Sequence, residues 1–116
     1  MIATMPKKKV EGAFDGLDDQ IVDIVGQFVK RRKEAYEKAA IKLKNNLRDD
    51  VIRYTEMLDD RKISKDDYEF LVRGRYAQLK IELLEQVSLS KSKFDLVTED
   101  VVKLLVKTGL NAVASV

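Results

Sequence analysis

Four pairs of adjacent aspartates are the side chains of this sequence best suited to chemistry. Paired carboxylates can share a proton in acid–base catalysis or hold a hard cation such as Mg²⁺. Neighbouring helical residues, however, point about 100° apart, and no Glu-x-x-His motif of carboxylate-bridged metal bundles accompanies the pairs. We therefore interpret these aspartates as helix caps and solvated turn residues. The pairs are Asp18/Asp19, Asp49/Asp50, Asp59/Asp60 and Asp66/Asp67.

The composition removes most other catalytic and metal-binding templates. The 116 residues include no His and no Cys, so the usual general base, the commonest metal ligand and the thiol nucleophile are missing. The glycines form neither a Walker nor a dinucleotide-binding pattern. We expect no catalytic centre, no metal and no cofactor. One alternative is a carboxylate cluster formed by Glu82 or Glu85 from two copies at a dimer axis.

The overall composition predicts an all-α protein. Charged residues make up 36% of the chain and aromatic residues 7%, with a single Pro, which is typical of long, surface-rich helices. No segment approaches the ~18 consecutive apolar residues of a membrane span, and the N-terminus lacks the apolar core of a secretory signal. We therefore expect a cytoplasmic protein.

The segment 59–67 predicts a turn between two long helices. Ser64 followed three residues later by Asp67 resembles a capping box, in which the serine hydroxyl and the carboxylate accept from each other's backbone amides. Arg61 and Lys62 would close the preceding helix at the negative end of its dipole. A helix should therefore end before this segment and another begin at Ser64.

Apolar residues at helical spacing continue on both sides of that turn. Steps of mostly three and four run from Leu17 to Leu58 and from Tyr68 to Leu104, with Asp18 as the expected N-cap of the first series. We predict an antiparallel helical hairpin about 65 Å long at 1.5 Å per residue. Residues 1–13 would be a flexible basic tail and residues 14–116 a single helical domain.

Two places in these arms could interrupt a helix. The segments 45–49 and 88–92 contain Asn or Ser, which are poor helix formers. We favour continuity at both, because the apolar spacing passes through them. The alternatives are a third helix after a break near 88–92, or a compact bundle of three or four helices with breaks at both segments.

A second apolar face predicts a partner. It would complete a bundle with coiled-coil-like packing, by homo-oligomerisation or against another helical protein. Arg32 lies inside the stripe of the first arm, where it could be an interface contact or could extend its head into water. The residues predicted to bind a partner are Phe70, Gly74, Ala77, Ile81, Leu84, Val102, Val106 and Arg32.

A basic stripe is predicted on the outer face of the first arm. Four cations project to one side of the helix, and Glu34 and Glu37 lie at the spacing of intrahelical ion pairs. A solvated face with salt bridges is favoured over nucleic-acid binding, because no aromatic residue is placed to stack on bases. The four cations are Lys30, Lys33, Lys44 and Arg48.

No family motif is recognised in the chain. In size and outline it is similar to the small secreted helical hairpins of the WXG type, which act as dimers, although it has no Trp for their Trp-x-Gly turn. In size and basicity it is similar to small helical bacteriocin-immunity proteins. We expect a non-enzymatic helical module for protein–protein interaction or oligomerisation. The alternatives are a compact bundle that binds and neutralises a protein target, and a helical nucleic-acid-binding protein.

Overall fold

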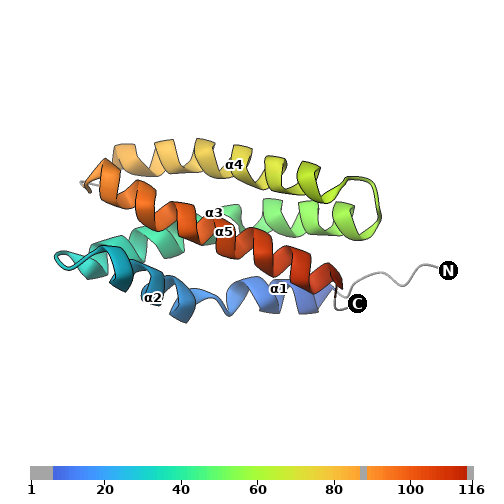
Figure 1. Ribbon diagram of the computed structural model, residues 1–116, viewed down its shortest axis with the longest axis horizontal. Coiled ribbons are helices and arrows are strands. Elements are labelled where there is room, and N and C mark those ends of the chain that lie inside the picture. The colour runs from blue at the N-terminus through green and yellow to red at the C-terminus, as the bar shows by residue number, and fades with distance from the viewer. Residues whose placement is uncertain (1–6, 87–88, 115–116) are drawn as a thin grey trace.

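The computed structural model describes residues 7–86 and 89–114, and its helices confirm the all-α prediction (Figure 1). None of these described residues lies in a strand. The helices are α1 (Lys7–Asp15), α2 (Asp18–Phe28), α3 (Lys33–Asp59), α4 (Lys65–Gln86) and α5 (Lys91–Ala114).

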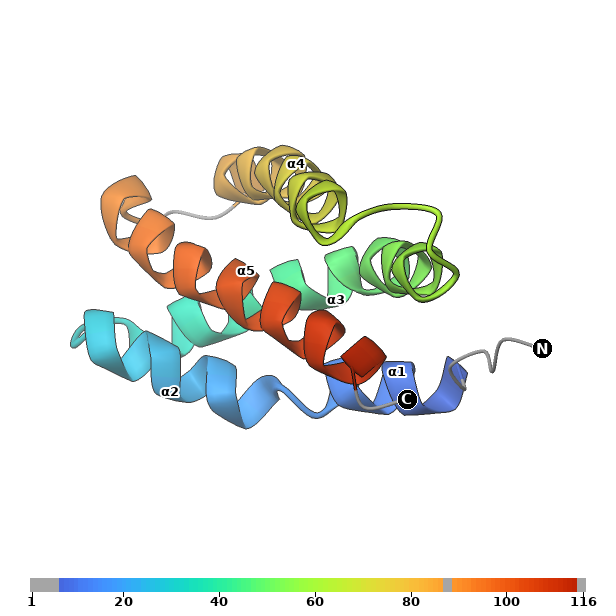
Figure 2. The ribbon, with the colours of Figure 1, turned by 45° about the vertical axis from the view of Figure 1, so that its right-hand side comes forward.

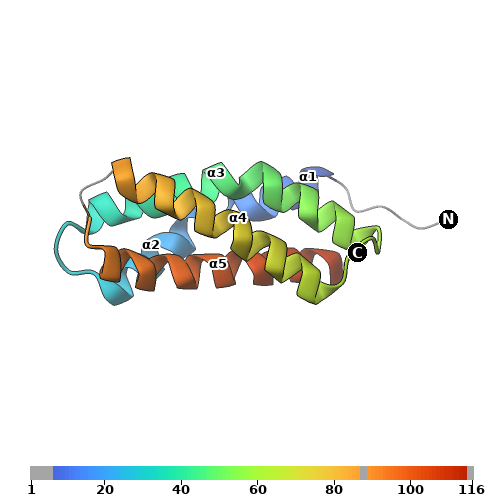
Figure 3. The same cartoon turned by 90° about the horizontal axis from the view of Figure 1, so that it is seen from above.

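The helices form a bundle in which α1 and α2 together occupy one position and α3, α4 and α5 each occupy another. The two short helices α1 and α2 follow one another along one side, and α3, α4 and α5 then run alternately up and down (Figures 1 and 2). Both α3 and α5 pack against every other helix, so they form the centre of the bundle. The α1–α2 pair and α4 flank them on opposite sides, and Figure 3 shows α4 crossing over the α3–α5 pair.

The turn between α3 and α4 is the predicted one. The Ser64 backbone amide donates to Asp67 Oδ2 at 3.2 Å, and the Asp67 amide donates to Ser64 Oγ at 3.1 Å, which completes a reciprocal capping box. The end of α3 is closed by bonds from the Arg61 amide to the Leu58 carbonyl and from the Lys62 amide to the Met57 carbonyl. This is a Schellman motif with Arg61 in the left-handed conformation at φ 59°.

The predicted first arm is not one helix, because the chain folds back at residues 29–32. The four consecutive cations Lys30 to Lys33 interrupt the apolar stripe there, and Arg32 adopts a left-handed conformation at φ 57° before α3. Continuity through residues 45–49 is confirmed, since α3 passes through this segment without a break. The hairpin of two continuous arms is therefore wrong, and the molecule is 52 Å long.

The second arm is also interrupted. Helix α4 ends at Gln86 and α5 begins at Lys91, so the expected continuity is wrong and the alternative, a third helix after a break near 88–92, is confirmed. The Ser90 amide donates to the Tyr36 hydroxyl at 3.1 Å, which ties this connection to α3. Folding back lets α5 bury its apolar faces within the same chain. Residues 87 and 88 lie outside the described residues.

The predicted basic tail is helical over its second half. Residues 7–13 belong to α1, and Val10 and Phe14 are completely buried, so the tail prediction is wrong for that part. Residues 1–6 lie outside the described residues. Asp18 is the first residue of α2 rather than its N-cap, because Leu17 occupies the cap position without a side-chain bond.

Candidate functional site

The outer face of α4 carries the apolar residues that the sequence placed on a second face. Phe70 is 77% exposed and Ile81 is 59% exposed, and Gly74 and Ala77 between them are exposed as well. We call these four residues the α4 stripe. Leu84 continues the spacing but is partly buried against the core. An exposed Phe and Ile on one helical face are typical of an interaction site when they form a patch.

The α5 part of the predicted partner face lies inside the molecule. Val102 and Val106 belong to the hydrophobic core, at 0% and 7% exposure. Their assignment to a partner-binding surface is therefore wrong. The reason is that α5 is a central helix, which packs on one side against α4 and on another against α1 and α2.

Arg32 is also placed differently from the prediction. It is exposed in the connection between α2 and α3 and does not lie in an apolar helix stripe. Its carbonyl accepts from the Ala35 amide at 3.0 Å, so its backbone starts α3. It is remote in sequence from the α4 stripe, and the structure does not bring the two together as part of one helix face.

The cations on one edge of the α4 stripe are already bound to carboxylates. Arg73 Nε donates to Glu69 Oε1 and its Nη1 donates to Glu99 Oε1, both at 3.0 Å. Lys80 Nζ lies 3.1 Å from Asp95 Oδ1. The contacts with Glu99 and Asp95 join α4 to α5, and together with Glu69 these carboxylates neutralise the positive charge beside the stripe.

The carboxylates at the two ends of the stripe have no such partner. Asp66 and Glu85 are exposed and form no ion pair or hydrogen bond with any residue in the ranges 7–86 and 89–114. Arg75, on the other edge, donates from Nε to Asp50 Oδ2 at 2.7 Å. Among the described residues of α4, the charged side chains that project to the side of the stripe and have no ion pair are therefore negative.

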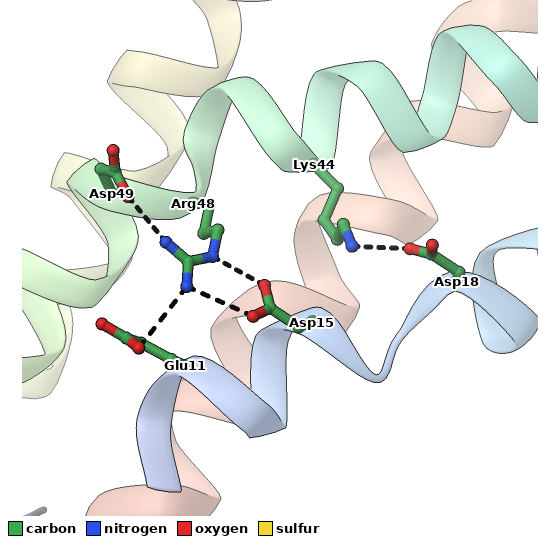
Figure 4. A network of polar contacts seen from close by, with 6 residues as sticks. All are labelled: Glu11, Asp15, Asp18, Lys44, Arg48 and Asp49. Carbon is green, nitrogen blue, oxygen red and sulfur yellow. Dashed lines mark hydrogen bonds and ion pairs between the residues drawn. The ribbon is translucent and has the colours of Figure 1, made fainter. Parts of the chain in front are cut away.

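Two of the four cations of the predicted basic stripe, Lys44 and Arg48, contact carboxylates of α1 and α2 (Figure 4). Lys44 is only 3% exposed, and its Nζ lies 2.6 Å from Asp18 Oδ1 on α2. Arg48 Nε donates to Asp15 Oδ1 on α1 at 2.6 Å. Only Lys30 and Lys33 remain largely exposed.

Arg48 is the centre of a small charge network between α1 and α3. Its Nη2 lies 3.7 Å from Glu11 Oε2, and its Nη1 donates to Asp49 Oδ1 at 2.9 Å. The hydrogen bond from Arg48 holds the pKa of the Asp15 carboxyl below its ordinary value. Sequence reasoning missed this network, although the spacing of Val10 and Phe14 ahead of Leu17 already extends the apolar stripe back into α1.

Two buried tyrosines of α4 form hydrogen bonds to threonines of the central helices. The Tyr68 hydroxyl lies 2.8 Å from Thr55 Oγ1, and the Tyr76 hydroxyl lies 2.9 Å from Thr98 Oγ1. Each threonine hydroxyl donates to a carbonyl four residues back, so each tyrosine must be the donor to its threonine. Burial raises the pKa of Tyr68 to about 12. These buried polar groups satisfy one another.

The surface hollow at the α3–α4 turn is lined by apolar and charged residues. It has a volume of about 540 Å³, and Leu58, Leu110 and Val113 form apolar walls beside the charged residues Arg61 and Lys65. Across the part of the chain that the structure describes, no three His, Cys, Asp or Glu side chains gather in a group that could hold a metal ion.

Comparison of the chain with protein-family models, curated proteins and solved structures finds no match. Within residues 7–86 and 89–114, no helix has the length and apolar character needed to cross a membrane.

Proposed function

We propose that this chain is a non-enzymatic helical protein that acts by binding another protein chain through the α4 stripe. The observation that carries the proposal is the exposure of both Phe70 and Ile81 on one face of α4. Leu96 on α5 is the remaining large apolar side chain that is strongly exposed among the described residues. It has no exposed apolar residue of comparable size on its own helix.

The α4 stripe has the size pattern of a helix-packing surface. Gly74 and Ala77 lie between the two large residues, and small residues let a second helix approach closely. Burying the exposed parts of Phe70 and Ile81 would each contribute up to ~1.5–3 kcal/mol to binding. The remaining residues of the face would mainly provide shape complementarity.

A contact function is favoured over catalysis because the buried polar groups already have structural roles. Tyr68 and Tyr76 bind threonines, and Lys44 binds Asp18. The chain has no His or Cys that could serve as a general base or nucleophile. We expect no cofactor and no metal.

Of the two alternative functions, the fold and the ion pairs of α3 favour binding of a protein target over nucleic-acid binding. A compact bundle that binds and neutralises one protein target gains support from the fold-back of both predicted arms. Nucleic-acid binding loses support, because Lys44 and Arg48 are held by Asp18 and Asp15. We expect no salt-dependent binding of duplex DNA or RNA at physiological ionic strength.

Photo-crosslinking in cells that make the protein would test the proposal. A photoreactive phenylalanine analogue in place of Phe70 should form a discrete crosslinked product with a partner chain. The same analogue in place of Leu96 on α5 provides the matched control, since that side chain is also exposed. The Leu96 position should give no discrete product.

The variant Ile81→Glu decides whether the product depends on the α4 stripe. It adds a charge within the proposed contact and, because Ile81 is exposed, should leave the helical content unchanged. We expect the Phe70 crosslink to disappear. A crosslink that persists in Ile81→Glu, or an equal one from position 96, would contradict the proposed function.

A further inference from the structure

We propose that the partner segment is an amphipathic helix with Lys or Arg in both of its end turns, and not a second copy of this chain. This inference rests on the proposed function, because it specifies what binds the α4 stripe. It follows from the charges that surround the stripe and from the size pattern within it.

Negative charge brackets the α4 stripe. With Phe70 taken as 0° and about 100° per residue, Asp66 lies at about −40° and Glu85 at about +60°, so both project to the same side as the stripe. They are 19 residues apart in sequence, or ~28 Å along the helix. A partner helix of about 20 residues would bring both of its end turns to these carboxylates.

Among the residues that the structure describes, no cation forms an ion pair with Asp66 or Glu85. Arg73 and Lys80, on the nearest edge, are held by carboxylates of α4 and α5. Arg75, on the other edge, is held by Asp50. Binding a helix with cations at its ends would therefore add attractive pairs without breaking existing ones.

A second copy would bring like charges together in either orientation. An antiparallel copy that centres the contact between Gly74 and Ala77 places Asp66 of one chain level with Glu85 of the other, at both ends of the contact. A parallel copy places each carboxylate opposite its own equivalent. Juxtaposed like charges disfavour a partner, so the charge pattern selects against self-association.

The size pattern of the stripe points in the same direction. In an antiparallel copy the small residues Gly74 and Ala77 face each other and the large residues Phe70 and Ile81 face each other. A partner helix with large apolar residues at its centre and small ones toward its ends would instead fill the depression at Gly74 and Ala77. The surfaces would then be complementary, as tight helix packing requires.

A displayed library of helical peptides would test the proposed partner. The peptides would be about 20 residues long, with an apolar seam of varied size and fully randomised residues in the first and last turns. The full chain would be the target, and the Ile81→Glu variant would be used for counter-selection. We expect the selected peptides to carry Lys or Arg in both end turns and large residues at the centre of the seam.

Charge-reversal variants would separate the effect of the two carboxylates from non-specific apolar binding. The double variant Asp66→Lys with Glu85→Lys should bind a selected peptide about tenfold more weakly. Replacing the end-turn cations of that peptide by Glu should restore its binding to the double variant. The matched control is Asp19→Lys with Asp23→Lys on α2, which changes the net charge equally at exposed positions on the other side of the bundle. This control should leave binding unchanged.

Several outcomes would overturn the inference. They are an absence of binders, no enrichment of cations in the end turns, or equal weakening by the α2 control. Sedimentation of the full chain provides an independent measurement, for which we expect a monomer. A dimer that Ile81→Glu dissociates would refute the basic helix as the partner while supporting the α4 stripe as a contact surface, so this result separates the two proposals.

Discussion

The ring of Tyr68 on α4 packs directly against the backbone of Gly109 on α5. A Cβ atom at position 109 would lie 2.7 Å from Tyr68 Cζ and closer still to the hydroxyl, which is less than any ordinary packing distance. The hydroxyl is fixed in turn by Thr55 on α3. A glycine on one central helix and a threonine on the other therefore determine how closely α4 packs.

Replacing Gly109 by Ala should destabilise the protein. Tyr68 is completely buried and cannot move aside without losing its bond to Thr55, so we expect a loss of about 1–3 kcal/mol in the free energy of unfolding. Chemical denaturation would measure it. The control is Gly74→Ala, where nothing lies within 4 Å of the added Cβ and helix propensity predicts a gain of roughly 0.5–1 kcal/mol. In the Tyr68→Phe variant, Gly109→Ala should lower the free energy of unfolding by less than it does in the wild type. Equal losses in the two backgrounds would contradict the contact.

The variant Asp18→Asn should destabilise the protein because it leaves the buried ammonium of Lys44 without its counter-charge. We expect a loss of about 1–3 kcal/mol, measured by denaturation. Adding Lys44→Met should recover stability, since the buried charge is then gone. Glu34→Gln, which breaks the exposed pair with Lys38, should change stability by less than ~0.5 kcal/mol. A double variant no more stable than Asp18→Asn would show that the buried charge is not the cause.

Acid should weaken the bundle through two carboxylates. The hydrogen bond from Arg48 lowers the pKa of Asp15, and bonds from Lys91 and then Lys80 lower the pKa of Asp95, in each case below the ordinary value of 3.8. A lowered folded-state pKa stabilises the folded state above pH 3.8, and this contribution is lost as the pH falls through the folded-state value. The melting temperature should therefore drop in acid, and by less in Asp15→Asn and Asp95→Asn. Parallel pH curves for the wild type and both variants would contradict this assignment.

Alkali should weaken the bundle through Tyr68. Its pKa is raised by burial from the ordinary 10.0 to about 12, so the unfolded chain loses this proton first. The associated stability is complete below pH 10 and is lost as the pH rises from there toward 12. Lysines also titrate in this range, so the readout is the difference between the wild type and Tyr68→Phe. The wild type should lose stability more steeply, and identical slopes would argue against a buried neutral hydroxyl.

Arg61→Gly should stabilise the α3–α4 turn. Arg61 holds a left-handed φ of 59°, which glycine adopts without steric cost. The gain should be about 0.5–1 kcal/mol, because the greater freedom of glycine in the unfolded chain offsets part of the relief. Lys62→Gly, at a neighbouring position outside the left-handed region, should not stabilise. Thermal unfolding of both variants provides the comparison, and a gain at Lys62 alone would reverse the interpretation.

The sequence by itself determined the features that depend on a few neighbouring residues. The reciprocal bonds of Ser64 and Asp67 follow from local capping geometry, and the outward direction of Phe70 and Ile81 follows from the helical period. Both were predictable because the interactions involved lie within one or two turns of a helix. The partner-binding role of this face stays a prediction.

Only the tertiary structure decided whether the long apolar stripes stay extended or fold back. An apolar face has the same spacing whether another chain or the same chain covers it, so Val102 and Val106 looked like partner contacts although α5 buries them internally. The same ambiguity applied to Lys44 and Arg48, which could face water in an isolated helix but meet Asp18 and Asp15 once α1 and α2 lie against α3. Closing the connection at residues 29–32 costs little conformational entropy. The apolar surface buried by this fold-back stabilises the protein by more than that cost. This gain comes from contacts between segments that are far apart in the sequence.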